Sequence, residues 1–257
     1  MSEKNQTAMD AGYLPTLTGT LTSLLRADFA VLVQNRRSLI IAMMLPLFIL
    51  LTSKRAAVSG NAMLLSVSIT FGLVSIAILG YSLSVARDRE KGIFQRLRVT
   101  PAPPWTIMTS RLAVQVGACL TMAAAVLIAG AVVNGIALSP AGYALTAMVT
   151  LVGAAMFLSI GQALVGLIRS AETVSAVGRL VYIGLVLFGL LGESGRLGST
   201  LETAAVWSPY GTIAALMTGG MDTASWTGDT WLALAASLGY AAVFAGIGIK
   251  WFRWNAG

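Results

Sequence analysis

The most chemically distinctive residues of this chain form a charged segment between two apolar runs. Residues 87–101 read RDREKGIFQRLRVTP, so basic and acidic side chains alternate over residues 87–91, and two further arginines follow at 96 and 98. If the segment is helical, an apolar edge made by Ile93, Phe94, Leu97 and Val99 lies beside these charges. A short helix of this kind can insert its apolar edge into a groove on a partner, and ion pairs then fix the register. We therefore expect this segment to bind another protein; a solvated basic loop that binds anionic lipid is the alternative.

Several kinds of chemistry are excluded by the residues that the chain lacks. It contains no histidine and a single cysteine, Cys119, which excludes histidine acid-base catalysis and a zinc site. It also contains no Gly-Lys dipeptide, and hence no phosphate-binding loop of the Walker type. We expect no cofactor and no metal in this chain, and any nucleotide hydrolysis must come from another polypeptide.

A few polar residues interrupt the apolar runs and are candidates for a pathway through the protein. Gln115, Gln162 and Arg179 would be costly in lipid, so we expect them to face other helices or a cavity. Gln162 is the best candidate for a translocation path, and Gln115 is a further candidate. Arg179 is expected within reach of the inner surface, near the end of its span, with Glu172 as its candidate ion-pair partner. No cluster of acidic residues lies in the apolar runs, which argues against proton-coupled transport.

Composition indicates a chain built for lipid. Of its 257 residues 56% are hydrophobic and 11% are charged, about half the charge of a typical soluble domain. Six spans of about 20 residues use nearly the whole length, so we expect one all-α membrane domain covering residues 1–257 and no separate catalytic domain. The net charge of +7 comes from basic residues in short connections, which favours anionic lipid over nucleic acid as their partner.

Charge-free runs and turn residues predict the elements. Residues 1–16 form a mobile tail, and residues 17–37 form an amphipathic helix at the membrane surface, although Asp28 falls within its apolar stripe. The six predicted spans cover about 38–54, 62–85, 111–134, 142–168, 173–192 and 230–250. Pro46 is expected to kink the short first span, because it removes a backbone N–H.

The basic residues predict the orientation. With six spans and both termini in the cytoplasm, all of the 17 Lys and Arg residues fall inside except Lys54, Arg55 and Arg196. That bias follows the positive-inside rule and predicts a multi-pass protein of the inner or plasma membrane. No small-residue cleavage pattern closely follows the first apolar run, so we expect no removable signal peptide.

Residues 193–229 form a long connection on the outer side. Its apolar part, about 206–217, is too short to span, so we expect it to enter the outer leaflet and return; a helix on the outer surface is the alternative. Pro209 is suited to the first turn of that helix. Trp207 and Tyr210 beside it are candidates for an outer gate or for interfacial anchors.

These features together resemble the type-2 ATP-binding-cassette exporter permeases. The charged Arg-Glu-x-Gly run at 89–92, the Leu-x-Val-Thr-Pro sequence at 97–101 and the following return to the membrane resemble the cytoplasmic coupling segment of that family. The layout is also similar: an amphipathic helix, six spans and a long outer connection between the last two. By size, the chain resembles the daunorubicin-resistance-like drug and natural-product exporter permeases.

The resemblance implies the following partners and site residues. Two copies of a cytoplasmic ATPase would supply ATP and magnesium, and a second permease, identical or not, would complete the assembly. Segment 87–104 would carry a coupling helix, with these residues on or beside it: Arg87, Arg89, Glu90, Gly92, Phe94, Arg96, Leu97, Thr100 and Pro101. Many family members have an acidic residue where this chain has Gln95, a departure from the pattern.

The function implied is transport and not catalysis. The substrate would be a lipophilic drug, a natural product or a lipid-like molecule moved outward, with Pro46 added to the candidate pathway residues. Alternatives are a polysaccharide or glycolipid exporter, a secondary transporter driven by an ion gradient, and a membrane-embedded enzyme that acts on lipid. The acidic residues of the outer connection are too loosely spaced to suggest such an enzyme.

Overall fold

The computed structural model describes residues 17–34, 36–53, 62–98, 103–193, 198–222 and 226–252. Within these ranges every regular element is a helix. The predicted tail at 1–16 lies outside the described residues, as do Thr100 and Pro101 of the predicted coupling segment.

Two helices occupy the region predicted as an amphipathic helix and a first span. Helix α2 covers Leu17–Gln34 and α3 covers Arg36–Ser53, with Pro46 inside α3. The apolar part of α3, Met43–Thr52, is shorter than a typical span. Pro46 is itself buried.

Five longer helices are apolar enough, by length and composition, to cross a membrane. The first is continuous from Ala62 to Glu90 and consists of α4 (Ala62–Val74), the π-helix η1 (Ser75–Tyr81) and α5 (Ser82–Glu90). The others are α7 (Pro104–Asn134), α8 (Pro140–Leu167), α9 (Ala171–Glu193) and α12 (Gly228–Trp251).

Two of these helices differ from their predicted bounds. The helix predicted to end at 85 continues to Glu90, and the helix predicted to begin at 111 begins at Pro104. Charge marked the predicted ends, but a helix can extend beyond the apolar run when its charged side chains find partners. Proline is also favoured at the first helical position, where its missing N–H costs no hydrogen bond.

Helix α8 lies in the middle of the bundle and packs closely on its neighbours. A Cβ at Gly161 would lie 2.6 Å from the Ala77 carbonyl of η1, and one at Gly166 would lie 3.3 Å from the Gly248 carbonyl of α12. Any side chain at Gly161 would therefore push α8 and η1 apart. The absence of side chains brings the backbones together, as is common where membrane helices cross.

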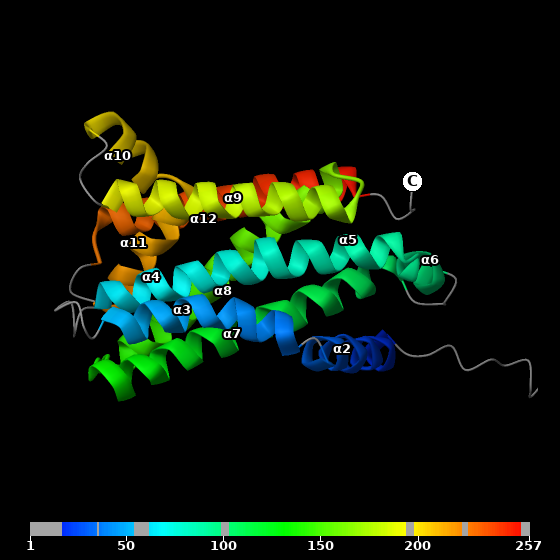
Figure 1. Cartoon of the computed structure of the whole chain (residues 1–257), viewed down its shortest axis with the longest axis horizontal. Coiled ribbons are helices and arrows are strands. Elements are labelled where there is room, and N and C mark those ends of the chain that lie inside the picture. Colours follow the sequence, from blue (N-terminus) through cyan, green and yellow to red (C-terminus); the bar gives the residue numbers. More distant parts are fainter. Residues whose placement is uncertain are drawn as a thin grey trace, which may run out of the picture.

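The bundle has two distinct ends (Figure 1). Helices α10 (Ser199–Val206) and α11 (Pro209–Met221) lie at one end, which we call the α11 end. The short α6 (Ile93–Arg98) lies at the opposite end, beyond α5, and α2 lies toward the same side. We call this the α6 end. The predicted connection 193–229 thus contains two helices, and α11 covers most of its apolar part.

Candidate functional site at the α6 end

A glycine turn separates α5 from α6. Gly92 has a φ of +68°, in the left-handed region that side chains disfavour. Its N–H donates to the Arg89 carbonyl at 3.0 Å, and its own carbonyl accepts from the Arg96 N–H at 3.2 Å. Gly92 therefore ends one helix and begins the next. This fixes α6 to the end of the first long helix.

Phe94 anchors α6 to its own chain. The side chain is fully buried, its ring meets the Phe252 ring edge-on at 5.9 Å, and the Arg111 guanidinium lies 4.8 Å from its centroid. Leu97 also packs against the core. We expected this apolar edge to enter a groove on a partner, and for Phe94 that expectation is wrong. The nearest apolar surface belongs to the same chain, and burying the ring there removes it from water.

The outward face of α6 is polar. Gln95 and Arg96 are exposed, while Phe94 between α6 and the bundle is not. The surface that α6 leaves for a partner is thus hydrogen-bonding and cationic. Such a surface suits an acidic or polar partner better than an apolar groove.

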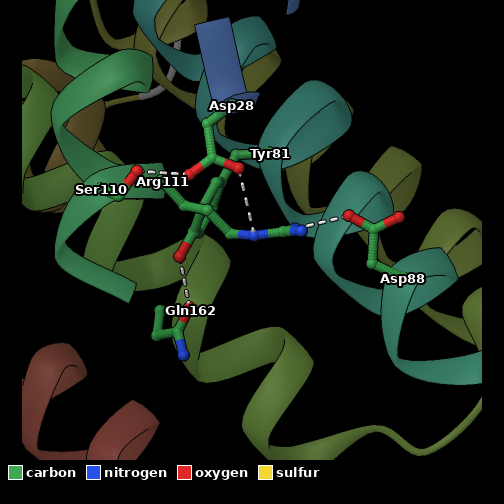
Figure 2. Close-up of polar contacts among 6 residues, drawn as sticks. All are labelled: Asp28, Tyr81, Asp88, Ser110, Arg111 and Gln162. Carbon is green, nitrogen blue, oxygen red and sulfur yellow. Dashed lines mark hydrogen bonds and ion pairs between the residues drawn. The ribbon is translucent and has the colours of Figure 1, made fainter. Parts of the chain in front are cut away.

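Arg111 of α7 joins three helices at this end (Figure 2). Its Nη1 donates to the Asp88 carboxylate of α5 at 2.5 Å, and its Nε lies 3.8 Å from the Asp28 carboxylate of α2. The hydroxyl of Ser110 donates to the other oxygen of Asp28 at 2.5 Å. The five residues Asp28, Asp88, Phe94, Ser110 and Arg111 are called the Arg111 cluster below.

Burial sets the electrostatics of the Arg111 cluster. The side chains of Arg111, Asp28 and Asp88 are 13%, 19% and 17% exposed. Burial raises the pKa of Asp28, against the opposing effects of the Ser110 hydrogen bond and the Arg111 charge. The single guanidinium of Arg111 is thus the ion-pair partner of two carboxylates that have little contact with water. In the sequence, Asp28 interrupts an apolar stripe and Arg111 begins an apolar run; an acid and an arginine in such positions are the signal that predicts a buried ion pair.

Arg89 binds the end of α8. Only 3% of the residue is exposed, and its two terminal nitrogens donate to the carbonyls of Val165, Ile168 and Arg169, each at 2.7 Å. The last carbonyls of a helix lack partners within it, and a cation at that end is favourable. Arg89 therefore caps α8 and does not face a partner protein.

Glu90 binds the start of α9. Its Oε1 accepts the Ala171 N–H at 2.6 Å, while the Ser170 hydroxyl accepts the Thr173 N–H at 3.1 Å. A carboxylate is favourable at a helix N-terminus because the free N–H groups there carry partial positive charge. Two neighbouring side chains of α5 thus hold both sides of the connection between α8 and α9.

A cavity of about 500 Å³ lies between α5 and α9 at the same end. Charged and apolar side chains share its lining, which includes Leu83, Arg87, Glu90, Glu172 and Arg179. Arg179 and Glu172 both reach this cavity, but no ion pair joins them. The predicted pairing of these two residues is therefore wrong, while Arg179 lies near the end of the bundle as expected.

The predicted pathway residues Gln115 and Gln162 both lie next to η1. The Tyr81 hydroxyl donates to the Gln162 Oε1 at 2.6 Å (Figure 2), and the Gln115 amide nitrogen would lie 3.8 Å from a Cβ on Gly80. Both amides thus face other helices, as expected. π-Helical turns are rare and occur often at functional sites. Their place in a substrate path stays a prediction.

The three candidate gate residues at the α11 end have different environments. Pro209 occupies the first turn of α11, and the Ser208 hydroxyl caps it by accepting the Gly211 N–H at 3.1 Å. Tyr210 is fully buried with its ring edge-on to Phe71 at 5.9 Å, so it is a packing residue of the core. Trp207 is 38% exposed, and its carbonyl accepts the Tyr240 hydroxyl at 2.9 Å.

Comparison with known proteins agrees with this geometry. A family model described as ABC-2 type transporter matches residues 19–210, from α2 to the start of α11. The chain is also 28% identical over 119 residues to the Bacillus subtilis (strain 168) protein named "Putative transport permease YvfS". That match covers 46% of this chain and 48% of the relative, so it spans about half the length of the curated relative.

Proposed function

This chain belongs to the ABC-2 type transporter family, and on that premise we propose that it is the membrane permease of an ATP-driven exporter whose ATPase is a separate chain. The α6 end would face the cytoplasm and bind the ATPase. ATP and magnesium would be bound by that partner. A second permease, identical or related, would complete the assembly. The substrate would be a lipophilic drug, a natural product or a lipid-like molecule, moved outward.

The observation that carries the proposal is the way in which α6 is mounted. Its outward face presents Gln95 and Arg96, while Phe94 and the Gly92 turn attach it to the bundle. When a partner bound to the polar face moves, it therefore displaces α6 together with the part of the bundle on which the other face of α6 is packed. A loop that only bound lipid headgroups would not need a fully buried anchor.

Force on α6 would reach the long helices through the Arg111 cluster. Phe94 touches Arg111, and Arg111 is bonded to α5 and paired with α2. ATP-driven closure of the partner would then shift α2, α5 and α7 together against the remaining helices. Such rocking of one group of helices against another is how many transporters change the side to which they open. The helices would do mechanical work only, and the chain would hold no catalytic residue.

Transport energetics test this proposal against an ion-driven transporter. The chain is reconstituted in vesicles with its partner ATPase, and uptake of a fluorescent lipophilic substrate is followed. We expect uptake that requires hydrolysable ATP and that continues when ionophores collapse the proton and sodium gradients. Uptake that stops with ionophore while ATP is plentiful would contradict the proposal and favour a secondary transporter.

A further inference from the structure

We propose that Arg89 and Glu90 act together as a clamp that makes the junction of α8 and α9 move with the coupling segment. They are positioning residues, because they act on other helices and touch no substrate or nucleotide. The inference rests on the proposed function, since it concerns how movement of α6 reaches the rest of the bundle.

The clamp consists of two adjacent side chains with opposite charges and different targets. Arg89 bonds the carbonyls of Val165, Ile168 and Arg169, which are the last part of α8 and the connection after it. Glu90 bonds the N–H of Ala171, the first residue of α9. The targets lie 76 to 81 residues further along the chain and all fall within residues 165–171, the junction of α8 and α9.

Each charge matches the helix end that it meets. The C-terminal end of α8 carries partial negative charge and receives the guanidinium, and the N-terminal end of α9 carries partial positive charge and receives the carboxylate. Exchanging the two charges would place both at unfavourable ends. This arrangement is more specific than a surface ion pair, where two mobile side chains need only meet each other.

The clamp is also directly connected to the α6 turn. The carbonyl of Arg89 accepts the Gly92 N–H at 3.0 Å, so the residue that holds α8 through its side chain holds the turn through its backbone. The Arg111 cluster connects α6 to α2, α5 and α7, while the clamp connects it to α8 and α9. Helix α8 carries Gln162, and thus the clamp gives movement at α6 a route to the Tyr81 and Gln162 hydrogen bond.

Arginine is required at position 89 if the clamp works as proposed. Three carbonyls in different directions are bonded by the planar fork of one guanidinium, and a lysine ammonium cannot reproduce that geometry. Position 90 needs only an acceptor for one N–H, which a glutamine amide oxygen can supply. The two positions therefore differ in what they tolerate.

The test measures transport and ATP hydrolysis in the same reconstituted complex. For Arg89→Lys and Glu90→Ala we expect transport to fall by about tenfold, as for loss of a hydrogen bond to a charged group, while ATP hydrolysis stays close to that of the unmodified complex. Glu90→Gln should restore most of the transport. Arg26→Ala, which removes an exposed arginine of α2, is the control for loss of charge and should leave the ratio of transport to hydrolysis unchanged.

The outcomes separate the clamp from the proposed function. Suppose that the unmodified complex transports with ATP, and that Arg89→Lys and Glu90→Ala have the same ratio of transport to ATP hydrolysis as it has. The clamp is then wrong and the exporter proposal stands. Should Arg89→Lys fail to assemble, Glu90→Ala alone decides, since it leaves the cap on α8 in place. Amide exchange at Ala171 provides a second readout. It should quicken in Glu90→Ala and not in Glu90→Gln, and equal exchange in both would also overturn the clamp.

Discussion

Arg111→Leu is expected to destabilise the protein by about 3 kcal/mol, because it leaves two partly buried carboxylates without their cation. Asp28 and Asp88 both interact with this one guanidinium, and neither side chain is more than 19% exposed. The substitution also removes the cation from the Phe94 ring and so loosens α6. Thermal unfolding of the purified protein in detergent, followed by tryptophan fluorescence, measures the loss.

Two comparisons make the Arg111 prediction specific. Adding Asp28→Asn and Asp88→Asn to Arg111→Leu should recover part of the stability, because the neutral amides remove the unpaired charge. Arg179→Leu is the matched control, because Arg179 is exposed and lines a cavity without an ion pair to Glu172. This substitution should change the free energy of unfolding by less than about 0.5 kcal/mol. A thermal midpoint for Arg111→Leu equal to that of Arg179→Leu would contradict the account of the cluster.

Phe94→Ala is expected to uncouple ATP hydrolysis from transport. The ring is fully buried against Phe252 and Arg111, and removing a buried phenylalanine side chain typically costs about 3–5 kcal/mol. Here much of that loss falls on the docking of α6, since a six-residue helix has few other contacts to hold it. The complex should still bind and hydrolyse ATP, but transport per ATP should fall sharply.

The neighbouring position supplies the control for Phe94. Gln95 is the next residue of the same short helix and is exposed, so Gln95→Ala should leave the packing of α6 on the bundle intact. Phe94→Leu should retain part of the coupling because it keeps an apolar side chain in the site. Full coupling in Phe94→Ala, measured as substrate moved per phosphate released, would show that the buried anchor transmits no force.

Local rules predicted much of the helical layout. Pro209 occupies a first helical turn as predicted, and Pro104 and Pro140 obey the same rule, with serines capping the helices that begin at Pro140 and Pro209. Charge-free runs located the five long helices. The close helix contacts at Gly161 and Gly166 were not predicted. The helices extend beyond the predicted spans, to Glu90 and from Pro104, because a helix does not end where charge begins if the charged side chains have partners elsewhere in the fold.

The contacts that make the site could not be predicted from local sequence. Arg89 and its carbonyl partners are separated by 76 to 80 positions, and Ser110 and Asp28 by 82. No spacing rule relates residues so far apart, because only the tertiary packing brings them together. The same limit explains Phe94: the pattern identified its apolar edge but could not tell whether that edge would meet the chain itself or a partner.

The π-helical segment η1 carried no signal that helical periodicity could detect. Residues 75–81 are as apolar as their neighbours, so the pattern of side chains does not distinguish a π-helical turn from an α-helical one. The two glutamines beside it were selected only because polar groups are costly in lipid. Their common location at η1 is a property of the fold.

Site-specific photo-crosslinking tests the central claim most directly. A photoreactive amino acid at Gln95, on the exposed face of α6, is compared with the same group at Leu201, an exposed position of α10 at the other end of the bundle. In membranes that contain the partner ATPase, we expect irradiation to link position 95 to the ATPase and position 201 to give no such product. Crosslinking of the ATPase to position 201 but not to position 95 would contradict the account.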